Sequence, residues 1–279
     1  MPPRPLLFFS HANGFPAGTY RKLFAQLEPH YRVAAPDCYG HDPLFPVTDG
    51  WRHLVRQAAH ELALVRQGDE PVILVGHSLG GFLSLMLAAS EPAAVRAVVM
   101  LDSPVLHGWK AGVIRAAKRV GLAARVPPAS VAWRRRDRFA SPDDALTHFA
   151  SKPVFARWDA DVLRDYVGCG VCRREDGAGL RFARDVEARI YQTLPHDLGR
   201  VASRLRQRVP GLPVGFIRGT RSQEVRQVGL AATRRLVGEH MRQIEGGHLF
   251  PMERPAQTAG ELLGLLAAMG VAPSLPRAA

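Results

Sequence analysis

Short runs of consecutive apolar residues recur along this chain, separated by segments whose apolar positions recur every three or four residues. The runs have the near-continuous hydrophobicity of parallel strands that are buried on both faces. They predict strands at residues 5–10, 31–35, 71–75, 95–101, 212–218 and 241–244. The segments between them predict amphipathic helices, such as the one whose stripe contains Trp51, Leu54, Ala58 and Leu62. This alternation predicts an α/β fold with a doubly wound, mostly parallel sheet covered by helices on both faces.

The alternation breaks over residues 105–208, directly after the strand that ends near Asp102. This stretch combines helical periodicity with several prolines and many arginines, and it offers no convincing pair of strands. It is too long to be a connecting loop. We therefore expect residues 105–208 to form a helical cap or lid, inserted into an α/β core made of residues 1–104 and 209–279.

The net charge of +12 raises the question of nucleic-acid binding. The basic residues are nearly all arginines, however, and they are spread over the whole chain. The densest run, residues 134–138, has no nucleic-acid motif around it. We therefore expect no nucleic-acid partner, and we interpret these arginines as a solvated face or as a rim that attracts an anionic substrate.

No apolar run approaches the roughly 20 residues that span a bilayer, so we expect no membrane span. The N-terminus also lacks the long apolar core and the cleavage site of a signal peptide, which favours a cytoplasmic protein. Three cysteines argue against a disulfide framework. Cys169 and Cys172 form one isolated Cys-x-x-Cys pair, which lacks the further ligands that a zinc site needs, so we interpret it as a reduced thiol pair. The sequence leaves the role of this pair and the oligomeric state open.

The most informative stretch is residues 71–81, where a buried strand runs into Gly76-His77-Ser78-Leu79-Gly80 and then into an apolar helix at residues 82–89. Strand, sharp turn and helix are the context in which Gly-x-Ser-x-Gly forms a nucleophile elbow. The two glycines let the strand and the helix approach each other, and the turn projects the Ser78 hydroxyl above the sheet. A serine hydroxyl needs a base to act as a nucleophile at neutral pH. His248 follows the last predicted strand and therefore lies at the same sheet edge as Ser78.

Four motifs, taken together and in order, resemble the α/β-hydrolase fold enzymes, in particular serine esterases with a helical cap. They are Asn13-Gly14-Phe15-Pro16, Asp37-x-x-Gly40-His41, the turn around Ser78, and Gly247-His248-x-x-Pro251-x-Glu253-x-Pro255. The resemblance covers the chain from near its start to its C-terminal helix, and it is weak only in residues 105–208. It implies that His248 is the general base for Ser78. It also implies that the backbone N–H groups of Phe15 and Leu79 stabilise the oxyanion, and that no metal or organic cofactor takes part.

Two residues compete for the role of the acid that orients His248. Most relatives carry Asp three residues after the glycine that ends the penultimate strand, which is Gly219 here, but this chain has Ser222 at that position. Asp102 ends the strand after the elbow strand, where some family members place their acid, and its use requires no distortion of a loop. Glu224 lies two residues beyond the vacant position and reaches the histidine only if its loop bends. We favour Asp102, with Glu224 and a purely helix-capping role for Asp102 as the alternatives.

These residues predict a carboxylesterase-like hydrolase of small or medium acyl esters that works through an acyl-enzyme on Ser78. A thioesterase, a C–C bond hydrolase or a cofactor-free perhydrolase uses the same triad, so the motifs do not separate these reactions. A non-catalytic ligand-binding member of the family is the alternative from another class. Such proteins usually lose a member of the triad, and Ser222 stands here in place of the usual acid. The expected partner is a small ester-type substrate, with a negative group if the arginines bind it.

Overall fold

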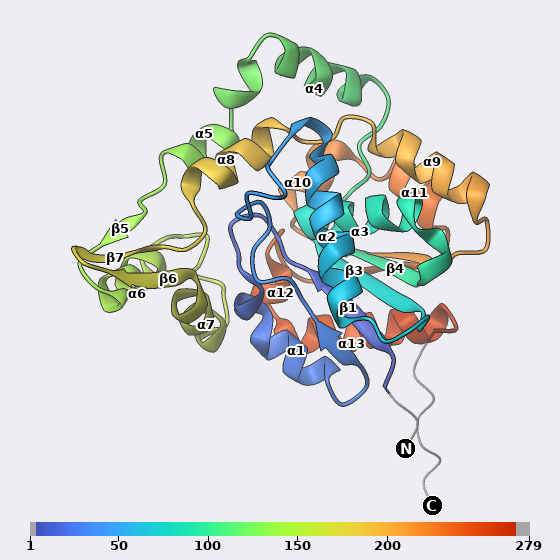
Figure 1. Ribbon diagram of the computed structural model, residues 1–279, viewed down its shortest axis with the longest axis horizontal. Helices are drawn as coiled ribbons and strands as arrows, with labels where there is room; N and C mark the ends of the chain where they lie inside the picture. The colour runs from blue at the N-terminus through green and yellow to red at the C-terminus, as the bar shows by residue number, and fades with distance from the viewer. Residues whose placement is uncertain (1–3, 272–279) are drawn as a thin grey trace, which may run out of the picture.

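The computed structural model, which describes residues 4–271, has a central sheet of six parallel strands in the order β2-β1-β3-β4-β8-β9 (Figure 1). The strands are β1 (Leu6–Ser10), β2 (Arg32–Ala34), β3 (Val72–His77), β4 (Val95–Leu101), β8 (Val214–Gly219) and β9 (Met241–Ile244). Each of them overlaps one of the six apolar runs, and the α/β class with a mostly parallel sheet is confirmed.

Helices cover both faces of this sheet, and the sheet separates two hydrophobic clusters. Successive residues of β3 show the division, because Val72 and Leu74 belong to one cluster and Ile73 and Val75 to the other, as the period of two in a strand requires. One cluster contains α1 (Arg21–Leu27) and α13 (Pro255–Ala268). The helices of the other cluster are α2 (Arg52–Val65), α3 (Leu79–Ser90), α9 (Leu198–Arg208) and α11 (Ala231–Val237). Two short helices, α10 (Gln223–Val228) and α12 (Phe250–Glu253), follow β8 and β9.

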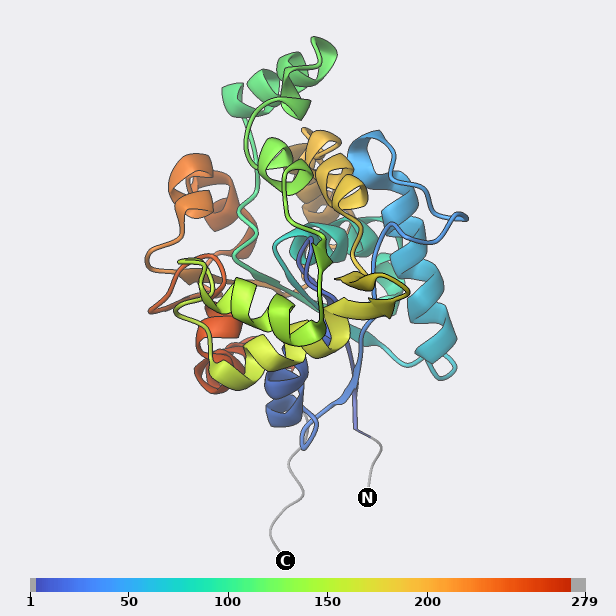
Figure 2. The same cartoon turned by 90° about the vertical axis from the view of Figure 1, so that its left-hand side faces the viewer.

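The segment between β4 and β8 contains helices and a second, smaller sheet (Figures 1 and 2). Besides α9, its helices are α4 (Trp109–Arg119), α5 (Ala129–Trp133), α6 (Pro142–Ala150), α7 (Ala160–Gly170) and α8 (Arg184–Gln192). Its strands are β5 (Arg138–Phe139), β6 (Val171–Arg174) and β7 (Gly177–Leu180), which form an antiparallel sheet in the order β5-β7-β6. The division of the chain into a core and a cap at residues 105–208 stays a prediction.

The expectation that this segment contains no pair of strands was wrong. The strands β6 and β7 form a hairpin in which Val171 pairs with Leu180 and Arg174 with Gly177. Two features hid the hairpin from the sequence. Each strand has only four residues, and β7 consists largely of glycine and alanine, which have low strand propensity. The Asp176-Gly177 dipeptide at the turn is the signal that could have revealed it.

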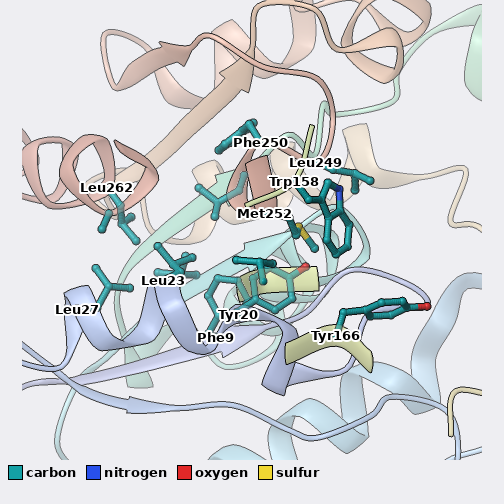
Figure 3. Packing of buried hydrophobic residues seen from close by; sticks show 14 of the residues in the cluster. Phe9, Tyr20, Leu23, Leu27, Trp158, Tyr166, Leu249, Phe250, Met252 and Leu262 are labelled. Carbon is teal, nitrogen blue, oxygen red and sulfur yellow. The ribbon is translucent and has the colours of Figure 1, made fainter. Parts of the chain in front are cut away.

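Residues of this segment pack against the loops at the carboxyl ends of the central strands. Figure 3 shows Trp158 next to Met252 and Tyr166 to the right of Tyr20, and all four residues belong to one apolar cluster. Phe15, in the loop after β1, also lies with its ring centroid 5.6 Å from each of the rings of Trp158 and Tyr166. None of the helices within residues 4–271 has the length and apolar character to cross a bilayer.

The elbow between β3 and α3 depends on close approach at two glycines. A Cβ atom on Gly76 would lie 2.1 Å from backbone atoms of Gly80. A Cβ atom on Gly80 would lie 1.9 Å from the carbonyl oxygen of Ser10 in β1. Both contacts are with backbone, which cannot turn away as a flexible side chain can. The start of α3 therefore packs directly on the ends of β1 and β3.

We predict that Gly80→Ala lowers the free energy of unfolding by about 3 kcal/mol or more, the upper end of the usual cost of overpacking. The matched control is Gly264→Ala in α13, where the added methyl group meets no atom within 4 Å. This control should be neutral or stabilising by up to about 1 kcal/mol, because alanine is the better helix former. Urea unfolding of both variants measures the difference, and equal stabilities would contradict the close approach at Gly80.

Candidate active site

Ser78 occupies the tip of the turn between β3 and α3 in a backbone conformation that L-amino acids rarely adopt. Its φ is 53° and its ψ is −115°. Its backbone N–H donates to the carbonyl of Leu101 at 2.9 Å, and its own carbonyl accepts from the Ser103 hydroxyl at 2.8 Å. These contacts with the end of β4 hold the turn in its strained form. The Ser78 side chain is partly exposed, above the sheet.

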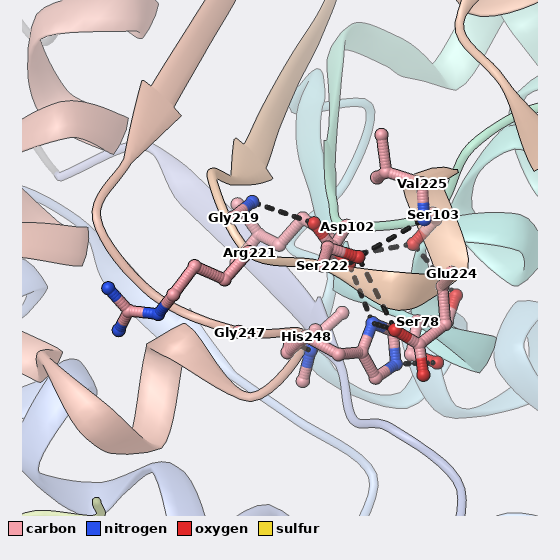
Figure 4. A network of polar contacts seen from close by, with 12 residues as sticks. Ser78, Asp102, Ser103, Gly219, Arg221, Ser222, Glu224, Val225, Gly247 and His248 are labelled. Atoms are coloured by element: carbon pink, nitrogen blue, oxygen red, sulfur yellow. Dashed lines mark hydrogen bonds and ion pairs between the residues drawn. The ribbon is translucent and has the colours of Figure 1, made fainter. Parts of the chain in front are cut away.

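His248, in the loop after β9, contacts both Ser78 and Asp102 (Figure 4). Its Nδ1 lies 2.7 Å from Asp102 Oδ2, and its Nε2 lies 2.9 Å from Ser78 Oγ. Because a carboxylate can only accept, Nδ1 carries the proton that it donates to Asp102. In the neutral imidazole, Nε2 is then left to accept the hydrogen bond of the Ser78 hydroxyl.

Asp102 lies one residue past β4 with its side chain fully buried and its φ at 50°. Its Oδ1 accepts from the backbone N–H of Gly219 at 2.8 Å, while Oδ2 accepts from the Ser222 hydroxyl at 2.5 Å as well as from His248. The alternative in which Asp102 only caps a helix is wrong, because the next helix, α4, begins at Trp109. Ser222, three residues after Gly219, donates a hydrogen bond to Asp102.

Glu224, the alternative acid, lies farther from the histidine and closer to solvent. Its Oε2 is 3.6 Å from His248 Nδ1, and 47% of its side chain is exposed. The same Oε2 lies 3.3 Å from the Ser222 hydroxyl. The structure thus brings both candidate acids to one side of the imidazole, with Asp102 in the hydrogen-bonding position and Glu224 as a neighbouring charge.

The pKa of His248 is raised above its ordinary value by the balance of burial and charge. Burial by itself lowers this pKa, because it disfavours the imidazolium. The hydrogen bond to Asp102 and the charge of Asp102 act in the opposite direction, followed by the charge of Glu224, and together they outweigh the burial. The site therefore stabilises a proton on His248 next to the Ser78 hydroxyl.

His77 connects three loops of the site through a chain of hydrogen bonds. Its Nε2 lies 2.8 Å from the carbonyl of His248 and must donate to it, so Nδ1 accepts from the Tyr20 hydroxyl at 2.8 Å. The Tyr20 oxygen in turn accepts from the N–H of Ala12 at 3.0 Å. Burial, and next the nearby His248, keep the pKa of His77 well below its ordinary value, so the ring is neutral.

His11 and His41 also serve as hydrogen-bonding groups of the loops rather than as bases for Ser78. The Nε2 of His11 accepts from the backbone N–H of Tyr39 at 3.0 Å, and burial lowers the pKa of His11 to about 4. The Nε2 of His41 accepts from the backbone N–H of Ala183 at 2.9 Å. This last bond ties the loop after β2 to the segment that contains α8.

The two predicted oxyanion donors differ in their surroundings. Leu79 is the first residue of α3, so its N–H is one of the groups that no carbonyl of its own helix can accept. The N–H of Phe15 donates to the carbonyl of Ala12 at 3.1 Å in the turn that follows β1. Leu79 therefore presents its N–H without rearrangement, whereas Phe15 would have to share or release this bond.

Above this turn lies an ion pair that the sequence did not indicate. Arg135 Nη1 is 2.6 Å from Glu187 Oε2, and Arg135 also contacts the hydroxyl of Tyr166. The backbone carbonyl of Glu187 accepts from the side chain of Asn13 at 3.0 Å. A Cβ atom on Gly14 would lie 2.8 Å from Glu187 Oε1, so the pair closes directly over the loop after β1. Neither partner belongs to a recognisable motif, and 52 positions separate them in the chain.

Within residues 4–271, one group of side chains has metal-ligand geometry, and it is the set of Asp102, Glu224 and His248. Their ligand atoms lie within 4.8 Å of one another. A metal ion there would have to replace the hydrogen bond between His248 and Asp102, so this donor set fits a proton better than an ion. Cys169 and Cys172 are free thiols at the end of α7 and in β6.

Comparison with known proteins gives the context for this geometry. The sequence matches the Alpha/beta hydrolase family over residues 7–261. It is 42% identical to Lipase LipV of Mycobacterium tuberculosis over 77 residues, which span 28% of this chain and 29% of that lipase. It is 28% identical to the Magnesium-chelatase 30 kDa subunit of Rhodobacter capsulatus over 256 residues, which cover 88% of this chain and 81% of that protein. Among solved structures, the fold is similar to that of E-2-(Acetamidomethylene)succinate Hydrolase, with a TM-score of 0.73, 22% identity and coverage of 94% of this chain and 91% of that one.

We predict that Glu224→Gln lowers the pKa of His248, because it removes a negative charge that stabilises the imidazolium. Asp102→Asn should lower it further, since it removes the stronger partner. The effect of Glu224 should shrink in high salt, because that side chain is half exposed and its charge is screened. An NMR titration of the His248 ring nitrogens measures all three quantities, and a larger effect from Glu224 than from Asp102 would reverse the ranking of the two acids.

Proposed function

This chain belongs to the alpha/beta hydrolase family, and we propose that it is a serine hydrolase that cleaves carboxylic esters of small or medium acyl groups. The observation that carries the proposal is the unbroken line of hydrogen bonds from Ser78 Oγ through the His248 ring to Asp102. This geometry is what a nucleophile, a general base and an orienting acid require. The similarity of part of the chain to a lipase supports an ester as the substrate.

In the first step, Ser78 Oγ attacks the ester carbonyl carbon while its proton passes to His248 Nε2. The carbonyl electron pair moves to the oxygen, which becomes the oxyanion of a tetrahedral intermediate. The imidazolium that forms is stabilised by Asp102, and it then returns the proton to the leaving alkoxide as the C–O bond breaks. The products are a free alcohol and an acyl group held on Ser78.

In the second step, a water molecule takes the place of the alcohol. His248 removes a proton from the water, whose oxygen attacks the acyl carbon, and the same proton then reaches Ser78 Oγ as the acyl bond breaks. We propose the N–H of Leu79 as an oxyanion donor in both steps, and the N–H of Phe15 as the second if its turn relaxes. Each such donor contributes on the order of 3–4 kcal/mol to the transition state.

We propose Asp102 as the acid of the triad and Glu224 as an auxiliary charge. Three donors converge on the Asp102 carboxylate, whereas Glu224 is half exposed and lies beyond hydrogen-bonding distance of the ring. The Ser222 hydroxyl supports this assignment, because it donates to the same oxygen that His248 contacts. A non-catalytic ligand-binding member is the alternative from another class, and the intact contact between Ser78 and His248 speaks against it.

The thioesterase, C–C hydrolase and perhydrolase alternatives use the same three residues. The residues that line the rest of the site therefore determine which acyl donor reacts. Three of the four arginines in the run at residues 134–138 already pair with carboxylates, so an anionic substrate could gain only the exposed Arg134 from this run. Arg135 is paired with Glu187, Arg136 with Asp144 and Arg138 with Asp176. The anionic group of the substrate therefore stays a prediction, as does the cytoplasmic location.

We predict that Ser78→Ala abolishes the hydrolysis of p-nitrophenyl esters from acetyl to octanoyl, with a loss of at least about ten-thousandfold in kcat. Fluorophosphonate labelling of the native chain should modify Ser78 and no residue of the variant. The pattern of rates over esters, thioesters and aryl diketones identifies the acyl donor. Absence of both turnover and labelling in the native protein would refute the proposed hydrolase.

We predict that Asp102→Asn lowers kcat/KM for the best ester by about ten-thousandfold, while Glu224→Gln keeps most of the activity. Because neutral His248 is the base, kcat/KM falls as the pH drops through its raised pKa. Removal of the Glu224 charge should therefore shift this acidic limb to lower pH. Adding Ser222→Asp to Asp102→Asn tests whether a carboxylate at the other strand end restores activity. A larger loss from Glu224→Gln than from Asp102→Asn would overturn the assignment.

A further inference from the structure

Helix α4 presents a stripe of apolar residues to the outside of the molecule. Trp109, Val113, Ala116 and Val120 follow one another at the spacing that places residues on one face of a helix. All four are exposed, with 75% of Trp109, 55% of Val113 and 76% of Val120 accessible. The helix contains no buried residue, and Figures 1 and 2 show it standing at the edge of the molecule, away from the central sheet.

The opposite face of α4 is attached to the body by its lysines. Lys110 donates to the backbone carbonyls of Gln227 and Val228, the latter at 3.2 Å. Lys118 is only 11% exposed, donates to the carbonyl of Leu194 at 3.0 Å and pairs with Asp49. These lysines hold the helix to the rest of the protein together with Ala111 and Ile114, which pack against the core, while a second apolar stripe is presented to the outside.

The apolar stripe continues into the residues that follow α4. Of the ten large hydrophobic side chains that are exposed within residues 4–271, seven lie between positions 109 and 133. They are Trp109, Val113, Val120, Leu122, Val126, Val131 and Trp133. We call these seven residues, together with the exposed Arg115, Arg119, Arg125 and Arg134, the 109–134 surface. Scattered apolar residues need no explanation, but a concentration of this kind marks an interaction site.

The charges of the 109–134 surface decide what can cover it. Residues 103–136 contain eight Lys and Arg residues and no Asp or Glu. A second copy of this chain would bring two such surfaces, each on a protein of net charge +12, into contact and would be repelled. An anionic phospholipid bilayer complements the surface in both respects. Its acyl boundary accepts the tryptophans and valines, and its headgroups accept the flanking arginines.

We propose that the 109–134 surface docks this protein on membranes rich in anionic phospholipid, with α4 lying in the plane of the interface. The stripe supplies the apolar burial, while Arg115 and Arg119 on α4 supply attraction to the headgroups. Binding is peripheral and reversible, because a single helix of 11 residues buries little apolar area. The docking is independent of the chemistry proposed for Ser78.

Co-sedimentation with vesicles tests the proposal on the whole 279-residue chain. Vesicles of phosphatidylcholine mixed with phosphatidylglycerol should retain the native chain at low salt and release it at high salt. Trp109→Ser with Val113→Ser should weaken this binding more than about tenfold. Arg115→Gln and Arg119→Gln should each weaken it about fivefold. The matched control is Leu44→Ser with Leu64→Ser, which removes two equally exposed apolar side chains elsewhere and should leave binding unchanged.

Each outcome decides the question. Circular dichroism and thermal unfolding first show that the variants are folded. Binding that requires both phosphatidylglycerol and the apolar stripe supports the docking. Three results overturn it: no retention on the mixed vesicles, equal retention on phosphatidylcholine alone, or equal loss in the Leu44/Leu64 control. A dimer of the native chain in light scattering that Trp109→Ser with Val113→Ser converts to a monomer would instead identify a protein–protein surface.

Discussion

The buried charge of Asp102 is the constraint around which the carboxyl edge of the sheet is arranged. A carboxylate with no exposed surface must be surrounded by donors, or its burial would be strongly unfavourable. The donors come from two other places in the chain, namely Gly219 and Ser222 at and just after the end of β8, and His248 after β9. One ionised group thus fixes three consecutive strand ends relative to one another. The geometry at Ser78 follows, because His248 can meet the serine only from the position in which Asp102 holds it.

The sequence predicted the central sheet well and the inserted segment poorly, for one physical reason. Strands buried on both faces must be almost wholly apolar, so the six central strands stand out in the chain. The strands β6 and β7 are short and partly exposed, and their side chains carry no such pattern. In the same way, Ser78 and His248 could be identified because they lie at defined places after strands. The contact of Arg135 with Glu187 depends on packing between the segment after α5 and helix α8, which are far apart in the sequence, so no local pattern encodes it.

The sequence alone does not decide between Asp102 and Glu224. Both residues lie at the right edge of the sheet, and the structure brings both within 4 Å of the same nitrogen. Burial and hydrogen bonding separate them, and neither can be judged from spacing alone. The chain of hydrogen bonds from Ala12 through Tyr20 and His77 to the His248 carbonyl could likewise not be predicted from the sequence. It nevertheless fixes the backbone of the proposed base.

Ser222 has a consequence for the charge that the space around Asp102 can hold. Its hydroxyl lies 2.5 Å from the Asp102 carboxylate, so an aspartate at position 222 would bring a second negative charge into the same buried space. Two carboxylates so close cannot both stay ionised without strong mutual repulsion. Position 222 can therefore hold a neutral hydrogen-bond donor beside Asp102 more readily than a second carboxylate. The Ser222 hydroxyl supplies that donor and adds no charge to the buried space.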